Sequence, residues 1–232
     1  MDERVYKSIN SSNNLVDIIG YVSSVPEYHH DTHGEKIYKF TIKSPRRNKG
    51  VFDTIQVEIS ERVIDVEVIK EDDLLHIQGE FRSFNEYNDV TGKASLRLYI
   101  FVRDLVILDK EYQGEFTNKV VLVGYICKDV IYRVTPSGRE ISDVILAVNR
   151  VYGRSDYLPC IVWSRNARFV SRLSVGTKVC FTGRLQSRIY TKKYDDGTVE
   201  DHEVYEVSVF DLCELNMDEV HNEEVVSEVK EG

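Results

Sequence analysis

The chain has 232 residues, 42% of them hydrophobic and 30% charged, which gives enough apolar material for one large or two small globular domains. No apolar run approaches the ~20 residues that a membrane-spanning helix needs, and the first residues lack the apolar core of a signal peptide. The net charge of −9 argues against a uniformly basic nucleic-acid-binding protein. We therefore expect a cytoplasmic protein that makes no membrane contact.

The charge is unevenly distributed along the chain. Residues 1–113 carry 15 basic and 20 acidic residues, residues 114–215 carry 14 and 13, and residues 216–232 carry 1 and 6. The middle block is close to neutral and rich in arginine, which leaves room for a local basic groove. The last block is acidic with little apolar content, so we expect residues 216–232 to form a disordered tail.

The first half of the chain predicts five strands separated by turn signals, with a short helical stretch between the third strand and the fourth. A long hairpin around Gly92 joins the last two strands. The predicted strands cover residues 14–24, 36–43, 54–60, 73–84 and 95–108, and the helical stretch covers residues 61–69.

The second half predicts the same succession of elements. Its turns fall at Gly138, at Gly176 and, in the last hairpin, at Gly197. The predicted strands cover residues 118–128, 139–149, 157–163, 177–189 and 202–215, and the helical stretch covers residues 165–173.

An internal repeat relates the two halves. The segment around Gly20 matches the segment around Gly124, 104 positions later, and three more segments match in the same order at the same offset. Four such matches indicate a duplication. Five strands with a helix between the third and fourth is the order of the OB barrel. We predict an all-β chain with one short helix per domain: two tandem five-stranded OB-fold barrels at residues 12–110 and 116–215.

The predicted strand 157–163 carries two large rings on one face. Leu158, Cys160 and Val162 would face a core, whereas Tyr157 and Trp163, the only tryptophan, share the opposite face. Two rings on one sheet face, followed by arginines, predict a platform that stacks nucleic-acid bases. The strand alone is equally compatible with a Trp163 packed in a core or at a subunit interface.

In sequence, the second half resembles the bacterial single-stranded DNA-binding protein family. The resemblance covers residues 116–213 in the family's order, and the first half shares it only through the repeat. Two OB units in one chain resemble tandem-domain members, which pair into dimers that supply four OB units. The chain lacks the family's Gly-rich linker and its acidic tip with bulky apolar residues. The segments that carry the resemblance are 118–124, Arg133, 135–138, 141–148, Tyr157, Trp163 and 183–188.

The resemblance implies four base-stacking positions, and all four are aromatic in this chain. Each stacked base can contribute ~1–3 kcal/mol. The stacking residues expected from the resemblance are Tyr152, Tyr157, Trp163 and Tyr190.

Arginines and lysines near these rings are expected to contact phosphates, because a planar guanidinium offers several donors. The hairpin 186–201 interleaves basic side chains with rings, which predicts a flexible arm that closes over a single strand. Any one of these arginines could equally be a surface salt-bridge partner. The predicted phosphate-binding residues are Arg133, Arg139, Arg150, Arg154, Arg165, Arg188, Lys192 and Lys193.

The first copy has lost the four rings. At the repeat offset their positions hold Asn48, Asp53, Ile59 and Glu86. If the core faces are aligned by parity instead, the third-strand positions become Thr54 and Ser60. We therefore expect the second domain to bind and the first to support it, to dimerise or to meet another protein. A weak site in the first domain is the alternative, through Lys39, Lys43, Arg46, Arg47 and Lys49.

The four cysteines, Cys127, Cys160, Cys180 and Cys213, lie in apolar strand-like segments without a C-x-x-C pair, which indicates reduced core thiols. The histidine-rich segment 29–33 is expected to be a solvated loop rather than a metal site. The sequence shows no phosphate-binding loop, metalloprotease motif or nucleophile constellation. We expect no catalytic residue, cofactor or metal.

Taken together, these observations predict a non-enzymatic protein that binds single-stranded DNA without sequence preference in replication, recombination or repair. It would act in the cytoplasm of a bacterium, at the nucleoid, or be encoded by a phage or mobile element. Expected partners are single-stranded DNA, a second copy in a homodimer, and replication or recombination proteins. The alternative is an OB-fold assembly subunit of a primosome or recombination complex, with secondary nucleic-acid binding. Single-stranded RNA is a third possibility, because stacking alone does not read the 2′-hydroxyl.

Overall fold

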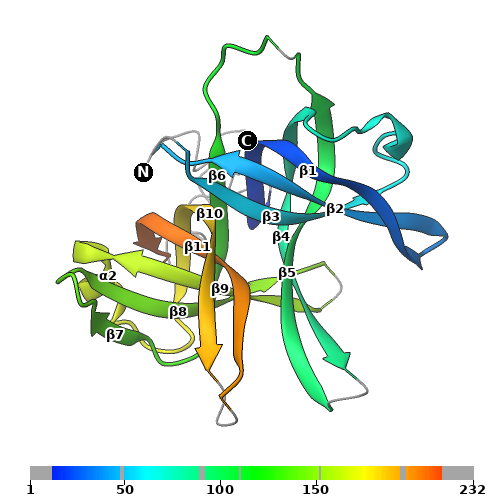
Figure 1. The fold of residues 1–232 in the computed structure, drawn as a ribbon. Helices are drawn as coiled ribbons and strands as arrows, with labels where there is room; N and C mark the ends of the chain where they lie inside the picture. The colour runs from blue at the N-terminus through cyan, green and yellow to red at the C-terminus, as the bar shows by residue number, and fades with distance from the viewer. Residues whose placement is uncertain are drawn as a thin grey trace, which may run out of the picture.

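The computed structural model describes residues 12–47, 50–88, 92–109, 111–151, 153–193 and 197–215. The acidic tail predicted at residues 216–232 lies outside these ranges. Within them, the chain forms two five-stranded barrels placed side by side (Figure 1).

The first barrel is closed by pairing between its first two strands. Its strand order is β2-β3-β5-β4-β1, and β1 also pairs with β2. Side chains such as Ile18, Val57, Phe81 and Ile100 fill its interior, each no more than 1% exposed. The strands are β1 (Asn14–Thr32), β2 (Glu35–Pro45), β3 (Phe52–Ser60), β4 (Leu74–Asn88) and β5 (Lys93–Ile107).

The second barrel repeats this plan with one addition. Its strand order is β6-β10-β11-β9-β8, closed by pairing between β6 and β8. The short strand β7 (Ile131–Val134), which the sequence did not predict, pairs with the outer edge of β8. The other elements are β6 (Asn118–Ile126), β8 (Glu140–Asn149), β9 (Ser155–Trp163), α2 (Ser164–Val170), β10 (Lys178–Lys193) and β11 (Val199–Glu214). The predicted fold, two five-stranded OB barrels, is confirmed.

The helical stretch between the third and fourth strands differs between the barrels. In the second barrel it is the α-helix α2, whose Ala167 and Val170 are buried. In the first barrel it shrinks to a 3-10 turn at Val66–Val68, capped by the Asp65 side chain. The prediction of a longer stretch over residues 61–69 was wrong, because five of these nine residues are β-branched and lower the helix propensity.

Strand β1 runs further than predicted. It continues past residue 24 to Thr32 and forms a long hairpin with β2, turning at His33 and Gly34. Register shifts at three points interrupt the alternation of apolar and polar residues, which hid the strand in the sequence. The prediction of a loop at residues 29–33 was therefore wrong.

A single sheet joins the two barrels. β1 pairs antiparallel with β6, and the centre of this pairing brings Val16 opposite Val120. These residues occupy equivalent positions in the repeat, so a pseudo-two-fold axis passes between them. The two long hairpins, β4–β5 and β10–β11, project to the same side (bottom of Figure 1). The domain limits 12–110 and 116–215 stay a prediction, since the sheet is continuous across them.

Two reciprocal polar contacts fasten the barrels together. On one side, Asp53 in the first barrel accepts hydrogen bonds from the Ser187 amide (2.8 Å) and from Arg46, whose Nη2 also donates to the Ser187 carbonyl (2.7 Å). On the other side, Asp156 accepts from the Ser83 amide and from Arg150. We call these two Arg–Asp–Ser groups the interdomain clamps.

No described helix is both long and apolar enough to span a bilayer. The four cysteines are free thiols; Cys160 and Cys180 are buried, and burial raises the pKa of both. Buried thiols with a raised pKa are poor nucleophiles.

Candidate nucleic-acid interface

Strand β9 presents its two rings on the outer face of the second barrel. Tyr157 is 49% exposed and Trp163 is half-buried, while Leu158, Cys160 and Val162 on the opposite face are at most 1% exposed. The predicted division of the strand into a ring face and a core face is confirmed. Trp163 therefore lies outside the barrel core.

The Trp163 ring is held in a fixed orientation. Its Nε1 donates a hydrogen bond of 3.0 Å to the Ser208 hydroxyl on β11. β11 runs parallel to β9, and Ser208 pairs with Ile161, two residues before the ring. This hydrogen bond satisfies the polar edge of the indole and leaves the rest of the half-buried ring for contact with a ligand.

Between the rings, strand β9 itself is apolar. Pro159 and Ile161 share the face with Tyr157 and Trp163, and β8 adds Ile145 opposite Pro159 and the charged Asp143 opposite Ile161. An apolar strand segment bounded by two rings suits stacked bases, because every base has a π-face and no directed hydrogen bond is required.

Two of the predicted phosphate-binding arginines already hold carboxylates. Arg133 on β7 donates to both oxygens of Asp143, at 2.6 and 3.1 Å, and this bidentate hydrogen bonding raises the pKa of the guanidinium. Arg188 on β10 donates to Glu206 at 3.1 Å. Both side chains remain half-exposed, so each keeps part of its positive charge at the surface.

Three other predicted arginines lie exposed to solvent near the two ends of β9. Arg139, Arg154 and Arg165 are exposed, and their guanidinium groups make no ion pair in the part of the chain that the structure describes. Arg154 precedes Tyr157 by three residues, while Arg165 follows Trp163. The open cations therefore flank the rings.

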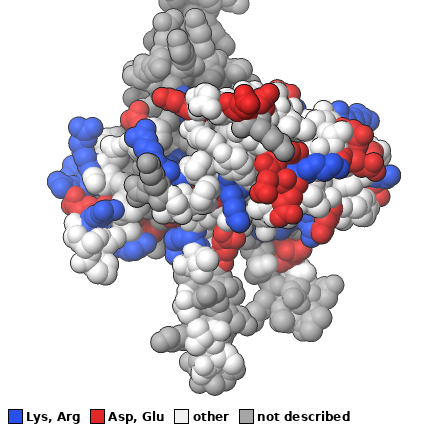
Figure 2. All heavy atoms as spheres, turned by 45° about the horizontal axis from the view of Figure 1, so that its top comes forward, with Lys and Arg blue, Asp and Glu red and all other residues white. Residues whose placement is uncertain are grey.

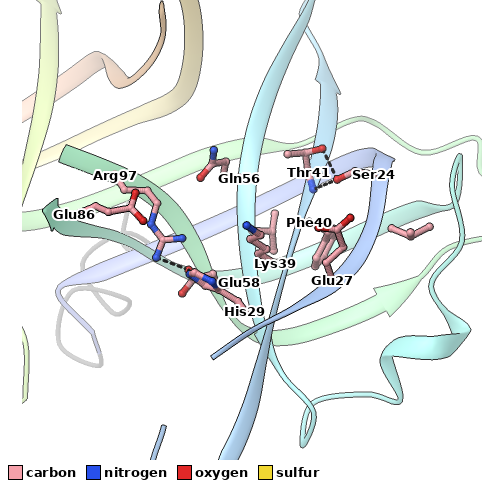
Figure 3. Close-up of a pocket in the computed structure, with 12 residues that line it drawn as sticks. Ser24, Glu27, His29, Lys39, Phe40, Thr41, Gln56, Glu58, Glu86 and Arg97 are labelled. Atoms are coloured by element: carbon pink, nitrogen blue, oxygen red, sulfur yellow. Dashed lines mark hydrogen bonds and ion pairs between the residues drawn. The ribbon is translucent and has the colours of Figure 1, made fainter. Parts of the chain in front are cut away.

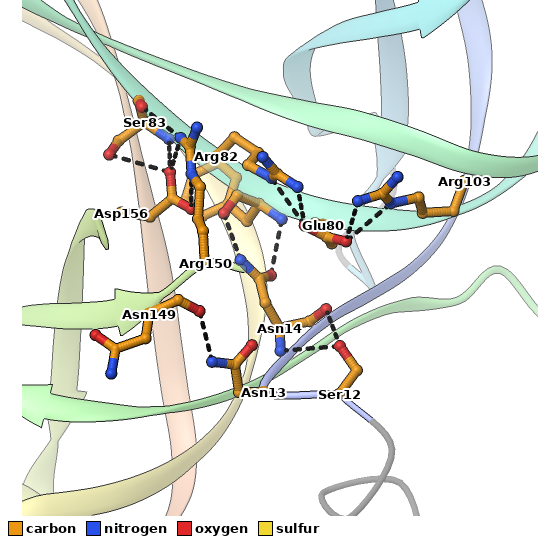
Figure 4. Close-up of polar contacts among 11 residues, drawn as sticks. Ser12, Asn13, Asn14, Glu80, Arg82, Ser83, Arg103, Asn149, Arg150 and Asp156 are labelled. Atoms are coloured by element: carbon orange, nitrogen blue, oxygen red, sulfur yellow. Dashed lines mark hydrogen bonds and ion pairs between the residues drawn. The ribbon is translucent and has the colours of Figure 1, made fainter. Parts of the chain in front are cut away.

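Arg150 has a different surrounding from the one expected. Its guanidinium is about one-fifth exposed and forms part of an interdomain clamp, donating to Asp156 and to the Ser83 carbonyl at 2.8 Å (Figure 4). The hydrogen bond to Asp156 raises the pKa of the guanidinium. This arrangement gives Arg150 a structural role and does not support the predicted phosphate contact.

The remaining predicted residues cannot be placed on this face. Tyr152 lies outside the described residues, and so do the side chains of Tyr190, Lys192 and Lys193 on β10. Their stacking and phosphate roles stay predictions.

The first barrel carries no ring at the equivalent third-strand positions. Asp53 and Asp156 fill the same role in their clamps, which fixes the offset of this strand at 103 residues and confirms the parity alignment. Thr54 and Ser60 therefore replace Tyr157 and Trp163. Among the alternative basic residues, Arg46 is engaged by Asp53, while Lys39 and Lys43 are exposed.

The two barrels also differ in surface charge. On the face drawn in Figure 2, basic side chains gather on the left, over the second barrel, and the larger acidic groups lie to the right, over the first. This distribution follows the charge difference between the two halves of the sequence. A phosphate chain is attracted more strongly to the second barrel.

Sequence reasoning missed several residues of this interface. Ser208 and Asp143 gave no signal, because a lone serine or aspartate in a strand is compatible with many roles. The clamp residues were also missed, although the conserved spacing of Arg46 and Arg150 in the repeat was a signal that could have found them.

The fold and this face define a tandem OB-fold protein with a ring-bearing sheet face on its second barrel. Residues 117–212, which make up the second barrel, match the "Single-strand binding protein family", and the resemblance predicted from the sequence is confirmed.

Curated relatives agree with this family match. "Single-stranded DNA-binding protein 1" of Staphylococcus aureus is 44% identical over 80 residues, covering 32% of this chain and 48% of the relative. "Single-stranded DNA-binding protein A" of Bacillus subtilis is 39% identical over 80 residues, covering 32% and 46%. The chain thus spans about half the length of the curated relatives it matches.

Among solved structures, the wild-type single-stranded DNA binding protein from Thermus aquaticus superposes with a TM-score of 0.70 over 88% of this chain and 94% of its own. The identity is 19%, so this likeness shows the fold alone. Because it covers most of the chain, it extends to both barrels.

Proposed function

We propose that the protein is a non-enzymatic, sequence-independent single-stranded DNA-binding protein whose second barrel does most of the binding. The observation that carries this proposal is the outer face of β9, where Tyr157 and the Ser208-held Trp163 bound the apolar residues Pro159 and Ile161. The family of the second barrel and the names of its relatives support the same function.

In this proposal, a single strand lies along β9 with bases stacked on the two rings. Its phosphates meet the exposed guanidinium groups of Arg139, Arg154 and Arg165, and the half-exposed Arg133 and Arg188 add positive charge nearby. Stacking does not depend on salt, but phosphate neutralisation does, so affinity falls as salt rises.

Trp163 itself is the probe for the test. Titration with a poly-dT oligonucleotide should quench its fluorescence deeply at low salt, and added salt should reverse the quenching. Binding without quenching would move the site away from β9. Absence of binding at low salt would refute the proposal.

A second candidate function rests on the acidic first barrel, which has no ring at the third-strand positions. This favours an OB-fold assembly subunit of a primosome or recombination complex, with secondary nucleic-acid binding. A protein partner captured equally well by the wild type and by Trp163→Ala, with no measurable DNA binding, would support it.

We infer further that the protein forms a homodimer, so that two chains supply four OB units, and that it meets replication or recombination proteins in a bacterial cytoplasm. Size-exclusion chromatography with light scattering should then give about twice the 26.9 kDa of one chain. A monomer at working concentration would contradict the dimer.

A further inference from the structure

The first barrel has a pocket of its own on the face that corresponds to the β9 platform. The β1–β2 hairpin forms one wall, and β2, β3 and the β4–β5 hairpin complete a cavity of about 360 Å³ (Figure 3). This volume lies within the range of small-ligand sites. Glu58 on β3 lines the pocket together with Arg97 on β5 and His29 on β1.

Glu58 replaces an apolar residue of the second barrel. At the offset of the third strand it corresponds to Ile161, so it lies between Thr54 and Ser60, the positions that replace the two rings. Glu58 is only 3% exposed, although a carboxylate is rarely buried unless an ion pair and hydrogen bonds compensate its charge. On the third strand, a charged residue between the two ring positions is therefore a feature of the first barrel alone.

The carboxylate is surrounded by cations but not fully satisfied. Glu58 Oε1 lies 2.8 Å from Arg97 Nη2 and 3.4 Å from His29 Nε2, and neither contact is a directed hydrogen bond. Among the described residues, Glu58 Oε1 and Arg97 Nε are the two buried side-chain polar atoms without a hydrogen-bond partner. Both belong to this one pocket. A buried acceptor and a buried donor left unpaired at one site call for a ligand that pairs them.

The ligand must present hydrogen-bond donors and an acceptor side by side. The lining carries three acidic side chains, Glu27, Glu58 and Glu86, beside His29, Lys39 and Arg97, so it offers a phosphate no excess of positive charge. Phe84 lies beside Arg97, whose Cζ is 5.8 Å from the ring centroid, and the ring is 53% exposed. A neutral planar ring could stack on this exposed phenyl face.

We propose that this pocket takes a single guanine base from a bound strand. Guanine carries two donors on its Watson–Crick edge, which a carboxylate can accept together, and beside them the O6 acceptor, which an arginine can donate to. Glu58 receives the two donors, Arg97 Nε donates to O6, and the phosphates lie at the edge of the pocket near Lys39, which is exposed and lines it. The first barrel then adds base selectivity to the unselective second barrel. The inference rests on the proposed single-strand binding.

The test compares oligonucleotides of one length by fluorescence anisotropy with the full chain. The probes are all-dT, and dT with scattered guanines, adenines or inosines at the same positions. Guanine should tighten binding by about fivefold or more over adenine, which controls for purine stacking. Inosine, which lacks the 2-amino donor, should lose part of that gain.

Variants locate the effect. Glu58→Gln should abolish the preference for guanine over adenine while leaving affinity for all-dT within about twofold, and Arg97→Lys, which removes Nε but keeps the charge, should do the same. Glu71→Gln makes the same charge change in an exposed turn outside the pocket and should behave as wild type.

The outcomes separate this inference from the function on which it rests. Tight all-dT binding with equal affinity for the guanine and adenine probes overturns the guanine pocket and leaves the proposed function standing. A guanine preference that survives in both variants also overturns it. Failure to bind any probe overturns the proposed function and the pocket together.

Discussion

At the scale of single residues, the protein places chemically similar side chains in different roles. Tyr157 and Trp163 make an open face because the Ser208 hydroxyl satisfies the indole and the barrel core lies on the other side of β9. In the first barrel the corresponding face holds a buried carboxylate, Glu58, instead of rings. The division of labour that we propose between the barrels thus rests on a few positions on one strand.

Removal of one ring should weaken DNA binding by a defined amount. Tyr157→Ala should lower the affinity for dT oligonucleotides by roughly 5- to 150-fold, the equivalent of ~1–3 kcal/mol for one stacked base. Fluorescence titration of Trp163 measures the effect. Tyr28→Ala is the matched control, since Tyr28 is 54% exposed, against 49% for Tyr157, and lies on the hairpin of the first barrel. Equal affinities for the wild type and Tyr157→Ala would contradict the stacking site.

Burial gives Glu58 a pH-dependent effect on stability. Desolvation raises the pKa of this carboxyl above its ordinary value of 4.5, and Arg97 opposes the shift. A raised pKa in the folded state favours the protonated form, so the contribution of Glu58 to stability is complete below the unfolded pKa. It is lost as pH rises through the folded pKa.

The wild type should therefore become less stable relative to Glu58→Gln as pH rises from about 4 to about 7. Thermal unfolding of both proteins across this range measures the difference, which cancels the titration of all other groups. Glu71→Gln should track the wild type at every pH. Parallel curves for the wild type and Glu58→Gln would show that folding does not raise the pKa of Glu58.

At the scale of elements, the last hairpin of each barrel depends on a glycine at a bulge. β10 shifts register against β11 between Thr182 and Gly183, and β4 shifts against β5 between Gln78 and Gly79. A Cβ at Gly183 would lie 2.5 Å from the Ser208 carbonyl oxygen, which is backbone and cannot move aside locally. At the bulge the two strands therefore lie too close together for a residue with a side chain at the glycine position.

Gly183→Ala should destabilise the protein by about 1–3 kcal/mol, the cost of overpacking a rigid site, measured by urea unfolding. It should also change the Trp163 emission, because the displaced Ser208 holds the indole. Gly79→Ala, at the equivalent bulge of the first barrel, should cost similar stability but leave the emission unchanged. An unaltered unfolding midpoint in Gly183→Ala would refute the close approach.

At the scale of the whole molecule, the two barrels form one continuous structure. The β1–β6 pairing extends one sheet through both barrels. In each interdomain clamp, the Arg–Asp pair of one barrel is hydrogen-bonded to a serine of the other barrel. The aspartates, Asp53 and Asp156, are each 1% exposed and depend on their arginines for charge compensation. We therefore expect a single cooperative unfolding transition for the whole chain.

Breaking one clamp should be costly. Arg150→Met leaves Asp156 buried with only the Ser83 amide and hydroxyl as donors, and loss of one partner of a buried pair costs roughly 3–5 kcal/mol. Guanidinium unfolding measures this loss, and adding Asp156→Asn should restore part of it by removing the uncompensated charge. A loss below about 1 kcal/mol, or two separate transitions, would show that the clamp does not join the barrels.

The sequence by itself determined the repeat, the strand order, and the two faces of β9. These depend on local alternation and on matching segments, which are visible without knowing what each strand packs against. It also determined the charge difference between the halves, since charge is a property of composition.

Only the tertiary structure decided what the polar residues do. The repeat matches Arg150 with Arg46, but only the packing against Ser83 of the other barrel shows that Arg150 belongs to a clamp. The sequence could not show that Glu58 is buried, because a glutamate at an outward strand position is normally solvated. The β1–β2 hairpin closes over that face and creates the pocket. Contacts between residues more than sixty positions apart leave no local pattern in the sequence. They stabilise the protein only once folding brings the residues together, so only the tertiary structure reveals them.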